Sequence, residues 1–95
     1  MEFKGTKGKW TASEIMNFSD TLVSFIENKK GKSIAQTRGC ITGEEKEAKA
    51  NANLIMASKD LLFACNRAKE DIKNGVADEQ TIIALENAIN KAIGD

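Results

Sequence analysis

The sequence predicts an α+β fold in which a small antiparallel β-sheet, a β-hairpin at its centre, is followed by a long helix and a shorter antiparallel helix. Residues 21–27 are rich in β-branched and aromatic side chains, as strands are. From Glu44 onward the apolar residues recur at helical spacing, and a second helical pattern follows the Asn74-Gly75 pair. The 95 residues suffice for a single domain covering 1–95.

The first part of the chain is expected to form the sheet, over residues 9–38. Residues 1–8 contain two glycines among mainly polar neighbours and are interpreted as a flexible lead-in. A short first strand is expected at 9–12. Residues 21–27 and 32–37 are expected to pair around the turn at 28–31, in which Gly31 is free to adopt a positive φ.

A four-residue turn also predicts the register of this hairpin. It sets Phe25 opposite Ile34 and places both with Val23 on one face, the expected core side. Leu22 and Ile26 then lie on the other face, which is too apolar for free solvent. We therefore expect Leu22 and Ile26 at a contact with another subunit.

The second part of the chain is expected to form the two helices. The long helix is expected over residues 44–73, because three glutamates favour its first turn and Asn74-Gly75 suits its end. The short helix is expected over 79–93 with Asp78 as its N-cap. At about 100° per residue the long helix carries one main stripe, formed by Asn51, Leu54, Ile55, Ser58, Leu61, Leu62, Cys65, Ala68 and Ile72.

A smaller apolar group lies nearly opposite this stripe and includes Met56 and Phe63. A helix that is apolar on two sides has two neighbours, and we expect Met56 and Phe63 to contact a second copy of the chain. Self-association also suits a chain this short, whose own core gives marginal stability. Cys65 falls on the main stripe and is expected in the core, whereas Cys40 is expected in a loop.

Charge and composition exclude several classes of function. The chain has 14 basic and 14 acidic residues and no histidine, so a general nucleic-acid coat and histidine catalysis are not expected. Residues 1–38 carry seven basic and four acidic side chains, a balance of +3 that suits an anion site. Phosphate-loop, dinucleotide and metal-ligand spacings are absent from the sequence, which predicts a non-enzymatic protein without cofactor or metal.

Four residues are candidates for ligand binding. Arg38 and Arg67 are the only arginines, and guanidinium groups bind phosphate in bidentate fashion. Trp10 is the only tryptophan and suits stacking on a base, and Asn51 suits orienting one. Structural interpretations remain open for each residue. Either arginine could form a surface ion pair, for example Arg67 with Glu70 or Asp71. Trp10 could be a core or interface anchor, and Asn51 could hydrogen-bond the hairpin backbone.

Residues 47–62 resemble a motif of small phage and prophage proteins, E-A-x-A-N-A-x-L-I-x-A-A-P-E-L-L. The matching residues are Glu47, Ala48, Ala50, Asn51, Ala52, Leu54, Ile55, Ala57, Leu61 and Leu62. Lys59 stands where that family has proline, so a break of the long helix near Ser58 remains open. The layout of a small sheet followed by two helices also resembles anti-Thoeris sponge proteins, phage proteins that oligomerise and trap a host signal of the cyclic ADP-ribose type.

This second resemblance implies a non-catalytic phage protein of the host cytoplasm that sequesters an anionic cyclic nucleotide or ADP-ribose-type messenger and acts as a homo-oligomer. The alternative is a structural or adaptor phage protein that acts through protein–protein contacts. Apolar runs of four residues or fewer predict no membrane span. The zero net charge makes nucleic acid an unfavoured partner.

Overall fold

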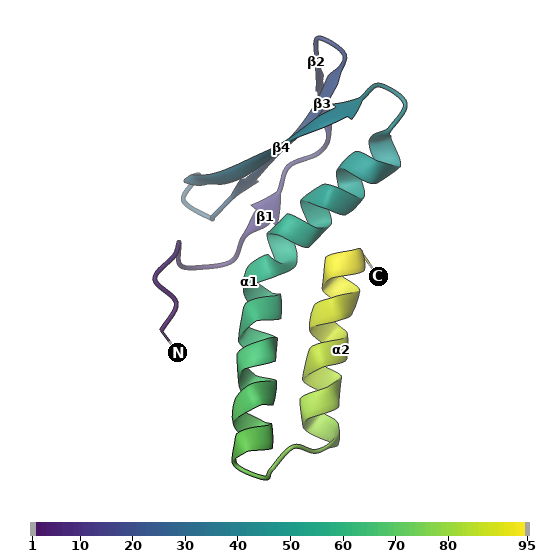
Figure 1. The fold of residues 1–95 in the computed structure, drawn as a ribbon. Coiled ribbons are helices and arrows are strands. Elements are labelled where there is room, and N and C mark those ends of the chain that lie inside the picture. The colour runs from purple at the N-terminus through teal and green to yellow at the C-terminus, as the bar shows by residue number, and fades with distance from the viewer. Residues whose placement is uncertain (1, 95) are drawn as a thin grey trace.

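The β-rich segment identified in the sequence forms the central strand of a four-stranded antiparallel sheet, and two helices follow it (Figure 1). The computed structural model describes residues 2–94 and is of the expected α+β class. The elements are β1 (Thr11–Ala12), β2 (Met16–Phe18), β3 (Thr21–Glu27), β4 (Ser33–Ile41), α1 (Glu45–Lys73) and α2 (Glu79–Ile93).

Strand β3 pairs with β4 along one edge and with β1 and β2 in succession along the other. Strand β2 was not expected. It returns to β3 through a two-residue turn in which Ser19 and Asp20 both have positive φ, 51° and 66°. Such turns match the twist of antiparallel strands. The Asn17 side chain supports the turn by accepting a hydrogen bond from the Asp20 N–H at 3.0 Å.

The predicted register of the β3–β4 hairpin was wrong. Phe25 lies opposite Gln36, not Ile34, and the loop runs over five residues, from Asn28 to Lys32. Two irregularities in the ladder, between Leu22 and Ser24 and between Ile26 and Glu27, add a further shift. Bulges of this kind insert an unpaired residue, which strand composition does not reveal.

The predicted roles of the two faces of β3 were confirmed for Val23, which is buried at 1% exposure, and wrong for Leu22, Ile26 and Phe25. Leu22 and Ile26, expected at a contact between subunits, are buried inside the protomer at 3% and 0% exposure. Leu22 packs in a cluster with Cys40 of β4 and Ala48 of α1. Phe25, expected on the core side, is only half-buried. The face of β3 that packs against α1 is therefore the one that carries Leu22. The simple hairpin register assigned this face to the outside of the protomer.

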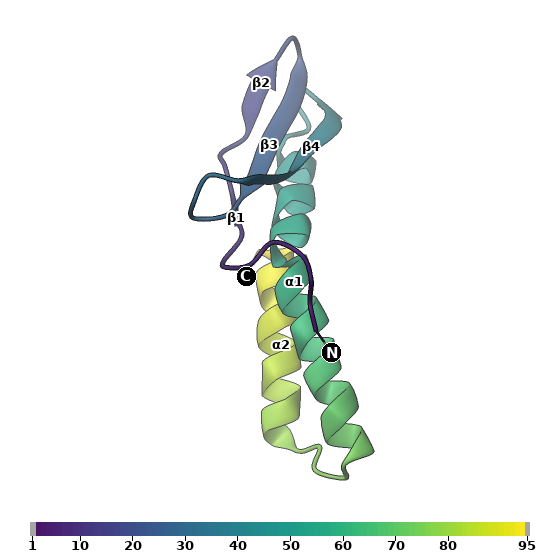
Figure 2. The same cartoon turned by 90° about the vertical axis from the view of Figure 1, so that its left-hand side faces the viewer.

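Helix α1 is continuous through Ser58 and joins the two ends of the molecule. Its first part packs across the sheet, and its second part runs antiparallel to α2 (Figures 1 and 2). The helix changes direction between these parts (Figure 1). Within α1 the Ser58 hydroxyl donates to the Ile55 carbonyl at 2.7 Å. Serine bonds of this type are known to bend helices. The result is an elongated molecule of 53 × 26 × 17 Å.

The helical hairpin closes through small side chains. Ala57 and Ala68 are the buried residues of the second part of α1, and α2 buries Thr81, Ala88 and Ala92. Asp78 caps α2 as expected, accepting hydrogen bonds from the backbone N–H groups of the first turn. Neither helix, within residues 2–94, has a stretch long and apolar enough to span a bilayer.

Candidate functional site

A groove lined by lysines lies between the lead-in and the β3–β4 turn. Its lining combines two segments that are far apart in the sequence and adjacent in Figures 1 and 2. The groove has a volume of about 710 Å³, within the range of small-molecule sites. We call it the lysine groove; its residues are Lys4, Gly5, Thr6, Lys7, Gly8, Asn28, Lys29, Lys30 and Lys32.

Contacts with α1 hold the lead-in side of the groove. The Trp10 indole donates to the Thr6 carbonyl at 3.1 Å, and the Lys59 ammonium donates to the Gly8 carbonyl. The same ammonium lies 5.4 Å from the centre of the Trp10 ring, a cation–π contact. Phe3 meets Phe63 edge to face at 5.8 Å. These contacts give residues 2–10 a defined path over α1, although they form no regular secondary structure.

The turn side of the groove is held by its own hydrogen bonds. The Asn28 side-chain oxygen accepts from the backbone N–H of Lys30 at 3.0 Å and of Lys32 at 2.9 Å. Gly31 has a φ of 79°, which a residue with a side chain rarely adopts. This geometry brings three lysines into one short loop.

The electrostatics of the lysine groove favour an anion. No carboxylate lines it, and within residues 2–94 no ion pair involves its lysines. Lys7 donates to the Phe3 carbonyl and lies 5.7 Å from the Phe3 ring centre. Five neighbouring positive charges repel one another, so an anion bound among them is attracted by all five.

The lysine groove was missed as a site, although half of its signal is visible in the sequence. The excess positive charge of residues 1–38 predicts an anion site in this half of the chain. The sequence does not show that the lead-in lies beside the hairpin turn, because no periodicity connects these two irregular segments.

Two of the four candidate ligand-binding residues lie together elsewhere. Arg38 of β4 and Asn51 of α1 line a shallow hollow of about 350 Å³ with Leu54 and Ile55 among its other walls. The Asn51 amide donates to the Cys40 sulfur at 3.8 Å, and not to the hairpin backbone. Arg38 is the one cationic side chain among the residues that line this hollow. The hollow therefore attracts an anion more weakly than the five lysines of the lysine groove do.

Trp10 and Arg67 lie apart from both of these sites. Trp10 is half-buried and holds the lead-in against α1, which agrees with its interpretation as an anchor. Arg67 pairs with Asp71 at 3.7 Å one turn further along α1, the ion pair weighed in the sequence analysis. It lies sixteen residues beyond Asn51, about 24 Å along the helix axis. The structure therefore does not assemble the four residues into one site.

Met56 and Phe63 have neighbours within their own chain. Phe63 contacts Phe3, and Met56 lines a second hollow with Ala12 and Ile15. The second apolar side of α1 is thus met by the N-terminal segment. This arrangement explains the two-sided pattern without a second copy at that side.

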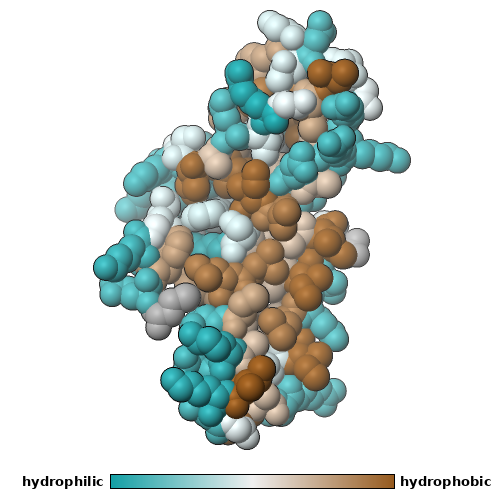
Figure 3. Space-filling view, in the orientation of Figure 1, coloured by the Kyte–Doolittle hydropathy of each residue, from teal (hydrophilic) through white to brown (hydrophobic). Residues whose placement is uncertain are grey.

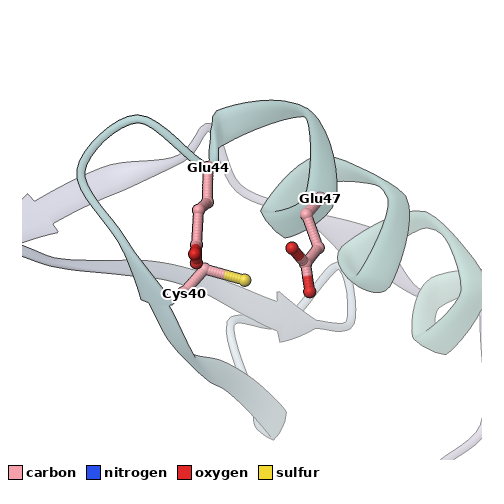
Figure 4. A group of neighbouring side chains, drawn as sticks. All are labelled: Cys40, Glu44 and Glu47. Atoms are coloured by element: carbon pink, nitrogen blue, oxygen red, sulfur yellow. The ribbon is translucent and has the colours of Figure 1, made fainter.

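Cys40, Glu44 and Glu47 form a small cluster at the start of α1 (Figure 4). The sulfur and one oxygen of each carboxylate lie within 4.8 Å of one another. Burial raises the pKa of the Cys40 thiol, and the negative charges of Glu47 and Glu44 raise it further. The raised pKa favours the protonated thiol, which is less nucleophilic than the thiolate.

The predicted positions of both cysteines were wrong, since Cys40 was expected in a loop and Cys65 in the core. Cys40 is buried on β4, where the strand continues beyond the expected end of the hairpin, and Cys65 is exposed on α1. The stripe that contains Cys65 is the side of α1 that the sequence predicts to face the core. Its exposure shows that the protomer leaves part of that stripe uncovered.

The fold and the groove define a small α+β protein with a surface cluster of lysines that form no ion pair among residues 2–94. A model of the family described as Salmonella phage P22 protein Y8K6 matches residues 1–95. The chain belongs to this phage-protein family, as its resemblance to small phage proteins implied. No curated protein and no solved structure matches it.

Proposed function

We propose that this phage protein is a non-catalytic binding protein that captures a small phosphate-bearing ligand in the lysine groove. The observation that carries the proposal is the convergence of five lysines without a lining carboxylate. Lysine ammonium groups bind phosphate as point charges and do not demand one fixed ligand geometry. The groove volume of about 710 Å³ accommodates a nucleotide.

The ligand class that we propose is an anionic cyclic nucleotide or ADP-ribose-type messenger of host antiviral defence. The family membership supports a phage role, and the groove supports the charge of the ligand. Capture takes place in the host cytoplasm under this proposal. A protein that only sequesters its ligand performs no turnover, so it needs a dissociation constant of about 1 nM, or roughly −12 kcal/mol.

Thermal unfolding with a panel of ligands tests the proposal. The panel contains a cyclic mononucleotide, a cyclic dinucleotide, cyclic ADP-ribose and, as the simple anion, inorganic phosphate. A ligand held at about a thousand times its dissociation constant stabilises the fold by about 4 kcal/mol. For a domain of this size we expect Tm to rise by roughly 15–30 °C. Chromatography after heat release should return the ligand intact, because no chemistry occurs.

The triple variant Lys29→Ala, Lys30→Ala, Lys32→Ala locates the site. It removes three of the five groove charges and should abolish the Tm shift. The matched control replaces Lys46, Lys49 and Lys69, three exposed lysines of α1, by alanine and changes the net charge equally. The control should retain the shift, since net charge alone does not form the groove.

Arg38→Ala distinguishes the groove from the Arg38–Asn51 hollow. We expect it to leave the shift unchanged, because Arg38 does not line the lysine groove. Loss of the shift in Arg38→Ala, with the lysine triple variant unaffected, would contradict the proposed site. The absence of any shift across the whole panel would contradict nucleotide capture and favour the structural or adaptor role.

A further inference from the structure

An apolar band runs along one side of the helical hairpin and lies open to solvent. It consists of Leu54, Leu61 and Ile72 of α1 and Ile82, Ile89 and Ile93 of α2. Five of these side chains are 50–69% exposed, and Leu61 is half-buried. In Figure 3 hydrophobic surface extends along both helices on the face seen in Figure 1.

The spacing of these residues places them on a common side of each helix. Leu54, Leu61 and Ile72 are separated by seven and eleven residues, which are whole numbers of turns to within about 40°. Ile82, Ile89 and Ile93 follow with steps of seven and four. Ile72 and Ile82 also line the same small apolar hollow of about 220 Å³ between the two helices, so the stripes of α1 and α2 merge into one band.

The protomer cannot cover this band itself because alanines already form the contact between α1 and α2. The small residues are the buried ones, and the larger leucine and isoleucine side chains of the band are left exposed or half-buried. In a paired hairpin such residues are the knobs that fill holes on the facing helices. The hollow that Ile72 and Ile82 line could receive such a side chain from a second copy.

The accessible surface of the chain indicates the size of the missing contact. The protomer exposes 6572 Å². A compact monomer of 10.3 kDa exposes about 5,400 Å², so the excess is about 1,200 Å². A stable interface buries about 800 Å² on each partner. The excess is therefore sufficient for one interface of standard size.

We propose that the apolar band is the interface of a two-fold homodimer in which two helical hairpins form a four-helix bundle. A two-fold axis parallel to the helices sets α1 of one protomer against α2 of its partner. Charge supports this arrangement. Lys73 ends α1 and Glu79 begins α2 at the same end of the hairpin, and neither has an ion-pair partner within residues 2–94. This two-fold axis therefore places Lys73 of each protomer close to Glu79 of the partner subunit.

Sedimentation equilibrium of the full chain tests the dimer. We expect the mass to rise from 10.3 kDa toward twice that value between about 0.1 and 100 µM protein. Ile72→Glu and Ile89→Glu each place a charge in the band and should weaken dimerisation at least about thirtyfold. Circular dichroism of each variant verifies that the protomer still folds, as expected for residues that are at least half exposed.

The matched control is Ile83→Glu, the same change one residue beyond Ile82 and therefore about 100° around α2 from it. It should dimerise as the unchanged chain does. A monomer at about 100 µM would overturn the proposal, and so would an oligomer whose mass Ile72→Glu and Ile89→Glu leave unchanged.

A native cysteine provides a second measurement that needs no variant. Cys65 lies four residues after Leu61 and seven before Ile72, hence on the side of α1 that carries the band, and it is exposed in the protomer. Its rate of alkylation by iodoacetamide should fall at least about tenfold between dilute and concentrated protein. A rate independent of protein concentration would contradict burial of the band by a second copy.

Discussion

At the scale of single residues, buried polar groups are matched to partners in this chain. Ser24 is fully buried; its hydroxyl donates to the Ser13 carbonyl at 2.8 Å, and its N–H donates to the Thr37 hydroxyl at 3.1 Å. These hydrogen bonds connect β3 to β4 and to the segment that follows β1. They lie beside the irregularity in the β3–β4 ladder between Leu22 and Ser24. An unpaired buried N–H costs about 1–3 kcal/mol, so the hydroxyls make the bulge tolerable.

The titration of Cys40 couples the stability of the fold to pH. Its raised pKa means that the folded chain binds the thiol proton more tightly than the unfolded chain. The stability from this group is complete below the unfolded pKa, about 8.5, and is lost as pH rises through the folded pKa. In the variant Cys65→Ser, we expect Cys40 to resist iodoacetamide near pH 8 and to react once guanidinium unfolds the chain. Rapid alkylation in the native state would contradict the burial and the raised pKa.

At the scale of elements, local signals determine helix ends more firmly than strand pairing. The Asp78 side chain accepts from the N–H of Gln80 at 3.0 Å and of Thr81 at 3.3 Å. The Thr81 hydroxyl in turn donates to Asp71 of α1 at 2.6 Å, so the cap also joins the two helices. The Asp78 cap thus stabilises the first turn of α2 and, through Thr81, helps to hold α2 against α1.

Asp78→Ala removes the capping acceptor, and we expect the free energy of unfolding to fall by about 0.5–2 kcal/mol. Chemical denaturation followed by circular dichroism measures the change. Asp78→Asn retains an acceptor oxygen and should lose less than half as much. Equal losses in the two variants would show that the negative charge, and not the hydrogen bond, stabilises the helix start.

At the scale of the whole molecule, the core is small and its helical part is built mainly from alanine. The buried apolar residues of α1 and α2 are all alanines, while eight leucines, isoleucines and phenylalanines of these two helices are exposed. The radius of gyration of 15.6 Å exceeds the roughly 12.4 Å of a compact domain of this length. Protomer stability and self-association are therefore expected to be coupled.

This coupling predicts a thermal midpoint that depends on concentration. For a dimer that dissociates as it unfolds, we expect Tm to rise by about 3–5 °C for each tenfold increase in protein. Scanning calorimetry over two decades of concentration measures this dependence. Ile89→Glu should flatten it, and Ile83→Glu should leave it intact. A Tm that is independent of concentration in the unchanged chain would contradict the coupling.

The sequence by itself determined the fold class, the two helices and their ends, and the sign of charge of the half that carries the lysine groove. Periodicity, capping residues and local composition are short-range properties, so they can be deduced from neighbouring residues. The tertiary structure alone decided that Leu22 and Ile26 are buried within the protomer, where Cys40 and Cys65 lie, and that Arg38 and Arg67 are far apart. Each of these depends on a bulge, a bend or a contact between distant segments, and such features change the outcome without changing any local pattern.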